Sequence, residues 1–253
     1  MTALGLACLS VIFVLTAFVS VVTGGTSLIT VPAMLQLGIH PHVAVATNML
    51  TLIFLSLGGT VPFLKSQLIH RKRLPILIGV TLIGSIVGAS LLLLAPPTSM
   101  PFVVAVAMIV VVVFSVSKGN AGMFVVGVEP ARISEVVGYV LTLILGVYGG
   151  FFSGGYVALL TAAFVACFGM TYLEAIATTK VLNLFSSLVA TAVFAVRGLI
   201  DWKLGLILGA VSFVSAAAGA ALSRKLSNHN LRRIFLVAVL ALAVKTLLYD
   251  VSW

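Results

Sequence analysis

Charged residues are scarce in this sequence. Asp, Glu, Lys and Arg make up 8% of its 253 residues, and five residues are acidic. Soluble domains carry roughly 25% charged residues, which keep their surfaces hydrated. This scarcity argues against a water-soluble fold.

The signatures of common enzymes and of redox or metal proteins are also missing. There is no His-Glu-x-x-His motif. Cys8 and Cys167 stand alone in apolar runs, which fits neither a disulfide framework nor a metal or redox pair, and predicts packing roles. His40-x-His42 is a weak metal signal that a loop at a membrane surface explains better. We therefore expect no metal site and no cofactor.

No Lys or Arg precedes Lys65, so the first hydrophobic stretch lacks the basic flank of a cleaved secretory signal. We expect it to be retained as part of the fold.

Long apolar stretches are abundant instead. Hydrophobic residues make up 62% of the chain, with a mean hydropathy of +1.31. A bilayer core requires about 20 apolar residues per helix, and such stretches recur along the whole length. The sequence predicts an all-α polytopic protein of the cell membrane, with the lipid bilayer as its surroundings. The formal charge of +9 comes mainly from short loops beside the spans, which indicates a cytoplasmic face and not nucleic-acid binding.

The chain is an internal duplication with a constant shift of 131 residues. From Gly24 to Leu91, 21 of 68 residues are identical to their partners in the second copy. Paired residues include Gly24 with Gly155 and Lys72 with Lys203. We predict a first membrane repeat over residues 1–120, a linker over 121–132 and a second repeat over 133–253.

Each repeat is predicted to contain an interrupted segment followed by three spans. In the first repeat they cover 3–37, 43–64, 74–94 and 101–118, and in the second 133–168, 173–196, 204–222 and 231–248. The basic loops at 65–73 and 224–233 share one side of the membrane if each interrupted segment folds back. Because this satisfies the positive-inside rule, we prefer an inverted repeat, as in many secondary transporters.

The two interruptions are the first candidate site. Glycines allow the backbone to leave helical geometry, and the helix that follows would start within the bilayer with its N–H groups free to bind an anion. The alternative is that these glycines only allow close helix packing. The candidate residues are Gly24, Gly25, Thr26, Ser27, Ser153, Gly154 and Gly155.

Polar residues at the start of the next span form the second candidate site. Lys180 lies inside an apolar span, where an ionisable residue is costly and indicates function. The alternative is that its long stem reaches the membrane interface. The candidate residues are Thr47, Asn48, Thr178, Thr179, Lys180 and Asn183.

A third pattern, Gly84-x-x-x-Gly88 with its counterpart Ser215-x-x-x-Gly219, predicts close helix contact between the two repeats.

The duplication, together with the runs at 24–32, 44–47 and 149–155, resembles the sulfite exporter TauE/SafE family, also called the toluene sulfonate uptake permeases. The resemblance covers nearly the whole chain and implies a carrier of sulfite, sulfonates or related small acids. At the first interruption, family members often have a longer glycine run than the Gly24-Gly25 of this chain.

The expected function is export of a small anion by alternating access, with a homo-oligomer possible. One alternative is an ion-coupled uptake permease for the same anions. Two others are an intramembrane serine hydrolase using Ser153 and a structural scaffold.

Overall fold

The computed structural model describes residues 3–61, 72–100, 102–106, 109 and 132–222. The predicted fourth and last spans, at 101–118 and 231–248, lie largely or wholly outside these residues. The same holds for the linker and for most of both basic loops. Within the described residues every regular element is helical.

Six of these helices are long and apolar enough to cross a membrane: α1 (Ala3–Thr23), α3 (Pro41–Thr60), α4 (Leu74–Leu94), α6 (Arg132–Phe151), α8 (Tyr172–Val196) and α9 (Trp202–Leu222). Two shorter apolar helices, α2 (Ser27–Gln36) and α7 (Tyr156–Phe168), follow α1 and α6. A short 3-10 helix, η2 (Pro97–Ser99), follows α4. The prediction of a polytopic helical membrane protein is confirmed.

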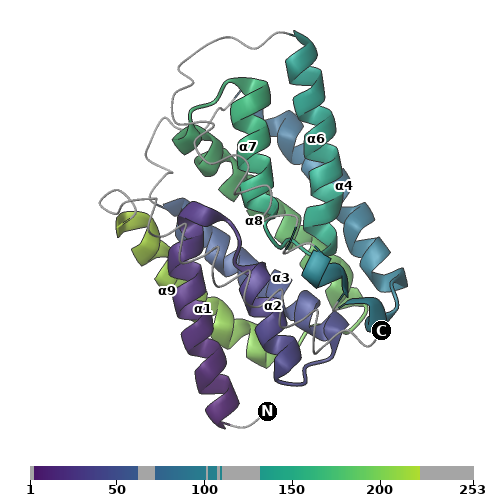
Figure 1. The fold of residues 1–253 in the computed structure, drawn as a ribbon, viewed down its shortest axis with the longest axis vertical. Coiled ribbons are helices and arrows are strands. Elements are labelled where there is room, and N and C mark those ends of the chain that lie inside the picture. The colour runs from purple at the N-terminus through teal and green to yellow at the C-terminus, as the bar shows by residue number, and fades with distance from the viewer. Residues whose placement is uncertain (1–2, 62–71, 101, 107–108, 110–131, 223–253) are drawn as a thin grey trace.

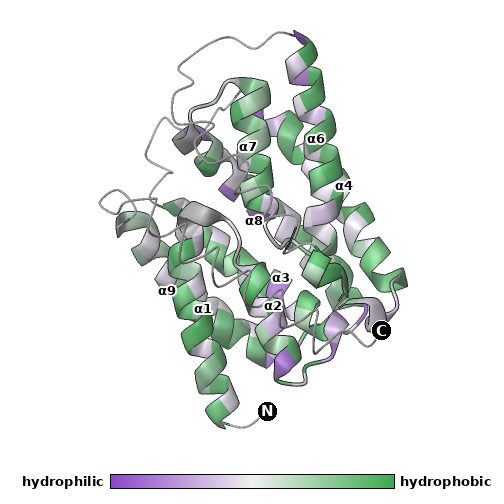
Figure 2. Ribbon diagram, viewed as in Figure 1, coloured by the Kyte–Doolittle hydropathy of each residue, from purple (hydrophilic) through white to green (hydrophobic). Residues whose placement is uncertain are grey.

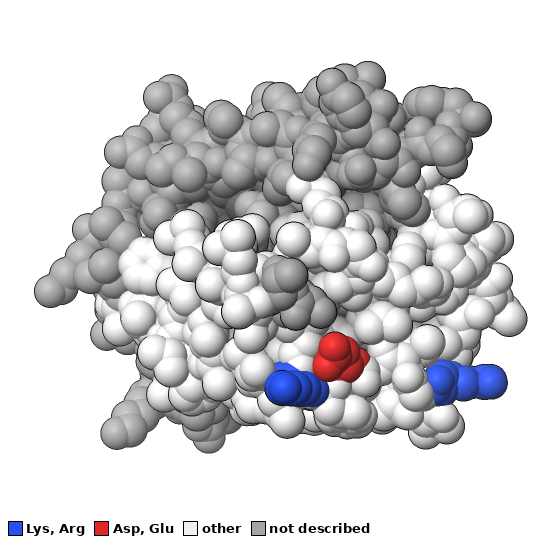
Figure 3. All heavy atoms as spheres, turned by 90° about the horizontal axis from the view of Figure 1, so that it is seen from below, with Lys and Arg blue, Asp and Glu red and all other residues white. Residues whose placement is uncertain are grey.

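The helices are apolar on their outer faces as well as inside. Figure 2 shows hydrophobic residues around most of the outer helices, and Leu94, Ile133 and Val214 are 81%, 80% and 68% exposed. Such surfaces are stable in lipid and not in water. Among the described residues on the face drawn in Figure 3, few side chains are charged. Of the two cysteines, Cys167 is buried as predicted, whereas Cys8 is exposed, so the packing role predicted for it is wrong.

Both interruptions are breaks between two helices. The chain leaves α1 at Gly24 and α6 at Phe152, and the paired glycines Gly24 and Gly155 have φ angles of 74° and 77°. This left-handed conformation is open to glycine without a steric cost. The short helices α2 and α7 also end alike, on the paired left-handed glycines Gly38 and Gly169.

Helix directions follow from which residues touch. Arg73, directly before α4, pairs with Glu135 at the start of α6, and Gly84 of α4 lies against Gly146 further along α6, so the two helices are parallel. The same reasoning makes α9 parallel to α1, because Ser215 bonds to Val14 and Gly219 packs on Phe18. The small-residue pattern therefore does join the two repeats, as predicted.

The central helices α3 and α8 run in opposite directions. Lys180 packs on Gly59 at the end of α3, whereas Asn183, further along α8, bonds to the earlier residue Ser56. Helix α3 is also parallel to α9, and thus to α1, because Gly205 and Gly209 pack on Leu50 and Phe54 in the same order. Between these two parallel helices, the chain must therefore return through α2 to the side on which α1 began. These directions support an inverted repeat, whose placement in a bilayer stays a prediction.

Candidate functional site

The two breaks lie against each other in the interior. A side chain at Gly24 would collide with Val157 and Ala158 in the first turn of α7. At the other break, Gly154 lies against Leu28 in the first turn of α2. The amino-terminal ends of both short helices, which carry positive partial charge, therefore face the same region.

The first break is held by a chain of buried hydrogen bonds. The Thr26 hydroxyl donates to the Ser20 hydroxyl at 2.5 Å. The Asn48 amide donates to the Ser27 hydroxyl at 2.8 Å and accepts from the Thr30 hydroxyl at 2.7 Å. All five side chains are buried, so each of these bonds satisfies a group that would be costly to leave unpaired. Asn48 thus fixes the start of α2 to α3.

The second repeat keeps one of these bonds. The Thr161 and Thr179 hydroxyls lie 3.1 Å apart, and these residues are the 131-residue counterparts of Thr30 and Asn48. In both repeats, therefore, the short helix is bonded to the same position of the following span. The duplication extends to individual polar contacts.

Lys180 places a buried positive charge beside the first break. Its side chain is 1% exposed, passes Gly59, and donates from Nζ to the Ser20 carbonyl oxygen at 3.2 Å. The same carbonyl accepts from the Gly24 backbone N–H at 2.8 Å. Among the residues that the structure describes, no carboxylate lies within ion-pair distance of Lys180. The side chain is buried in the interior, which favours the site interpretation over the alternative that it reaches the membrane interface.

Asn183 connects the second break to the first repeat. It lies nearly one turn after Lys180, donates to the Ser56 hydroxyl at 2.7 Å and accepts from the Ser153 hydroxyl at 3.3 Å. Ser153, Asn183 and Ser56 are all buried. Polar groups of both repeats therefore meet between the breaks.

Other candidates lie away from this region or have structural roles. The Thr47 hydroxyl accepts from the Asp201 backbone N–H at 3.0 Å and so anchors the connection between α8 and α9. The Thr178 hydroxyl is buried without a partner in the described part of the chain. Gly149 and Gly150 belong to the run at 149–155 but lie inside α6, where they allow close packing on Tyr156 and on the Ser85 backbone.

Sequence reasoning missed four residues of this region: Ser20, Thr30, Ser56 and Thr161. The repeat contains a signal for three of them, because at the 131-residue shift Thr30 pairs with Thr161 and Ser56 pairs with Ser187. Ser20 has Phe151 as its counterpart and gives no such signal.

The geometry offers little for hydrolysis or metal binding. In the described part of the chain the Ser153 hydroxyl bonds to an amide, which cannot act as a general base. No group of three or more His, Cys, Asp or Glu residues suited to a metal ion occurs among the described residues. What the region does offer is one ammonium, several hydroxyls and two helix amino termini, which are groups that bind anions.

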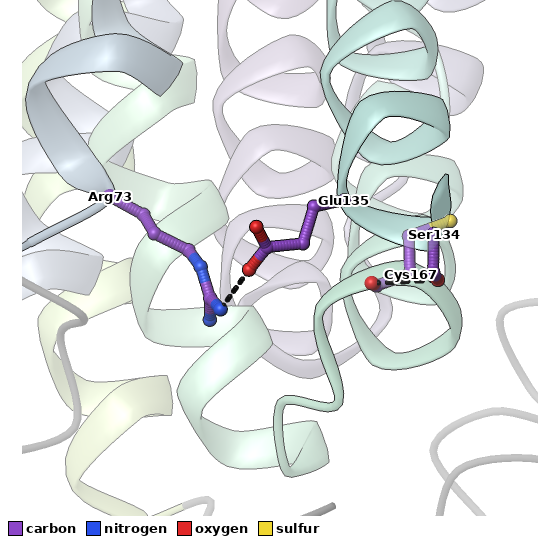
Figure 4. A network of polar contacts seen from close by, with 4 residues as sticks. All are labelled: Arg73, Ser134, Glu135 and Cys167. Carbon is purple, nitrogen blue, oxygen red and sulfur yellow. Dashed lines mark hydrogen bonds and ion pairs between the residues drawn. The ribbon is translucent and has the colours of Figure 1, made fainter. Parts of the chain in front are cut away.

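Further polar contacts occur at the helix ends, away from this region. Figure 4 shows the ion pair between Arg73 and Glu135 and the hydrogen bond from Ser134 to the Cys167 carbonyl oxygen, at 2.9 Å. They join the start of α6 to α4 and to α7. The side chains of Arg73 and Glu135 are 24% and 32% exposed, which marks the edge of the apolar interior.

Comparison with known proteins agrees with this description. The family model of the sulfite exporter TauE/SafE family matches residues 9–246. The probable membrane transporter protein ORF9 of Sinorhizobium sp is 29% identical, over 96% of this chain and 92% of its own length. A probable membrane transporter protein of Haemophilus influenzae is 26% identical, over 94% and 92%. The probable membrane transporter protein YfcA of Escherichia coli K12 is 27% identical, over 93% and 87%.

No solved structure matches the chain. The family model nevertheless spans nearly all of it, and six apolar helices long enough to cross a bilayer lie within the matched residues or overlap them. The chain is a multi-pass membrane transporter and belongs to the sulfite exporter TauE/SafE family.

Proposed function

We propose that this protein exports a small monovalent anion, such as hydrogen sulfite or an organosulfonate, by alternating access around the two breaks. The observation that carries the proposal is the buried ammonium of Lys180, which has no carboxylate partner among the described residues. The substrate anion supplies the missing negative charge.

Charge balance favours a monoanion. Burying an unpaired charge costs several kcal/mol, and a partner of opposite charge offsets part of that cost. One ammonium neutralises one negative charge, whereas a dianion would leave a net charge in the same apolar surroundings. The hydroxyl and amide groups nearby, those of Thr26, Ser153 and Asn183, supply uncharged donors for sulfonate-type oxygens.

The membrane potential supports export. An anion that leaves a cell with a negative interior gains about 2.3 kcal/mol per charge for each 100 mV, without a coupling ion. A proton relay would use a carboxylate deep in the membrane. The described carboxylates of Glu135, Glu174 and Asp201 all lie at helix starts, and Glu174 caps α8 through Thr171.

The first experiment measures anion binding by the purified protein. Anions that bind the folded state raise its melting temperature. We expect a rise with hydrogen sulfite or methanesulfonate and a smaller one with sulfate. Lys180→Met should abolish the rise, and Lys203→Met, at an exposed position, should retain it. An unchanged response in Lys180→Met would refute the assignment of the site.

A second experiment separates export from ion-coupled uptake. Proteoliposomes loaded with the anion should release it when a potential is imposed without a proton or sodium gradient. Strict dependence on either gradient would favour an uptake permease.

A further inference from the structure

The two packed units of the protein are not its two sequence repeats. Helices α1 and α3 pack on α9, and α2 packs on α1 and α3. Likewise α6 and α8 pack on α4, and α7 packs on α6 and α8. We call these groups the first bundle (α1, α2, α3 and α9) and the second bundle (α4, α6, α7 and α8). Each contains three helices from one repeat and one from the other. Figure 1 shows them at the lower left and the upper right.

The exchanged helices are firmly fixed in their new bundles. In the second bundle, the Ser85 hydroxyl of α4 donates to the Ser186 hydroxyl of α8 at 2.7 Å, and Gly84 lies against the α6 backbone. In the first bundle, Ser215 of α9 donates to the Val14 carbonyl oxygen at 2.5 Å. Gly58 of α3 also touches the backbone of α9 at Phe213. With backbones in such close contact, α4 and α9 cannot slide along their neighbours within each bundle.

The bundles themselves meet along α3 and α8, which we call the seam, and at the two breaks. Three described side-chain hydrogen bonds join the bundles. One, at the start of α3, links His42 Nε2 to the Ala95 carbonyl oxygen after α4, at 3.0 Å. The other two cross the seam, from Lys180 to the Ser20 carbonyl oxygen and from Asn183 to the Ser56 hydroxyl, and both start from residues of the proposed anion site. An anion that binds Lys180 and Asn183 competes with these two bonds.

We infer that the units that move during transport are the two exchanged bundles, with the anion releasing the Lys180 and Asn183 bonds across the seam. The inference rests on the proposed transport function. If the bundles move as units, a link between α4 and α8 joins the two repeats but still allows transport. If the sequence repeats moved as units, the same link would block transport.

The test uses two disulfide pairs in a Cys8→Ala, Cys167→Ala background. The first is Ser85→Cys with Ser186→Cys, which joins the repeats within the second bundle at residues outside the anion site. The second is Ser56→Cys with Asn183→Cys, which joins the bundles across the seam. Each is reconstituted, and methanesulfonate flux is compared before and after oxidation, with reduction as the reversal.

We expect oxidation of the Ser85 and Ser186 pair to change flux by less than twofold, and oxidation of the seam pair to reduce it at least tenfold, reversibly. A tenfold loss on linking Ser85 and Ser186 would overturn the inference, because it would mean that the repeats move as units. If the Asn183→Cys substitution alone removes flux, Ser20→Cys is added to the seam pair. The reactivity of its thiol toward a thiol reagent is then compared between the oxidised and the reduced seam pair. Equal accessibility would also overturn it. Absence of flux in the background protein would instead refute the transport proposal.

Discussion

At the scale of single residues, Ser153 combines backbone strain with a buried hydroxyl. Its φ angle is 64°, and it is the one described residue other than glycine with a positive φ. A left-handed backbone costs a residue with a Cβ about 1–2 kcal/mol. Strain of this kind persists where surrounding contacts enforce it and is concentrated at functional sites. Here the enforced conformation holds the hydroxyl against Asn183.

Replacing Ser153 by Gly or Ala separates the strain from the hydroxyl. Both variants lose the bond to Asn183, but only glycine relaxes the backbone, so we expect Ser153→Gly to be more stable than Ser153→Ala by about 1 kcal/mol. Unfolding of the detergent-solubilised protein measures the difference. Ser186, in helix α8, is the control: there alanine should be the more stable by about 1 kcal/mol. If the glycine and alanine variants had the same order of stability at both positions, backbone strain at Ser153 would be refuted.

Lys180 shows where the two repeats differ. Its counterpart is Met49, which is also fully buried, so the same position holds a charge in one repeat and an apolar side chain in the other. The symmetric scaffold therefore carries an asymmetric site. The ammonium donates to the Ser20 carbonyl oxygen of the first repeat, so this lysine links the two repeats.

At the scale of helices, close contact between α4 and α6 depends on glycine. A Cβ on Gly84 would lie 2.7 Å from the Leu143 carbonyl oxygen and 2.9 Å from the Gly146 carbonyl carbon. Backbone atoms cannot rotate away as a side chain can, so the helices would have to separate. Gly79, one and a half turns earlier on the same helix, has nothing within 4 Å of such a Cβ.

Two alanine substitutions on α4 test this contact. We expect Gly84→Ala to destabilise the protein by roughly 1–3 kcal/mol, through overpacking. Gly79→Ala should be neutral or stabilising by up to about 1 kcal/mol, because alanine favours the helix. Equilibrium unfolding in detergent compares both with the unaltered protein. Similar effects at the two positions would show that helix propensity, and not the contact with α6, determines the result.

At the scale of the whole molecule, helix directions predict which loops share a side of the membrane. The start of α3 and the start of α9 lie together, because Thr47 accepts from the Asp201 backbone. The starts of α4 and α6 lie together through Arg73 and Glu135. Helix α7 runs opposite to α6, because Ser134 bonds to Cys167 and Gly149 packs on Tyr156. It also runs opposite to α8, because Ser153 bonds to Asn183 and Thr161 lies beside Thr179. Helix α8 is therefore parallel to α6 and α4 but antiparallel to α3, so the two groups of helix starts belong on opposite sides.

Single cysteines in the Cys8→Ala, Cys167→Ala background test this topology. We expect His40→Cys and Lys203→Cys to react with a membrane-impermeant thiol reagent added outside intact cells. Lys72→Cys and Arg132→Cys should react only after the membrane is opened, since basic loops face the cytoplasm. All four positions are exposed. Labelling of His40→Cys and Lys203→Cys from different sides would refute the inverted arrangement.

Composition and sequence patterns were sufficient to predict the membrane class, the two breaks and those spans that the structure describes. A long apolar run predicts a membrane-spanning helix, because lipid offers no hydrogen-bond partners and a helix satisfies its own backbone groups. The glycines at 24 and 155 mark the breaks because few other residues tolerate their φ angles. The 131-residue shift predicted which positions are equivalent. Thr30 and Thr161 form one such pair and make equivalent hydrogen bonds, although the site prediction left both out.

Tertiary structure alone decided which helices form each bundle and what Lys180 touches. The exchange of α4 and α9 depends on backbone contacts between residues such as Gly84 and Gly146, which lie 62 residues apart, and no local pattern encodes such a partner. Likewise Ser20 contributes a backbone carbonyl to Lys180, and every residue has one. A sequence specifies which groups are polar, but only folding places a particular carbonyl beside a particular ammonium.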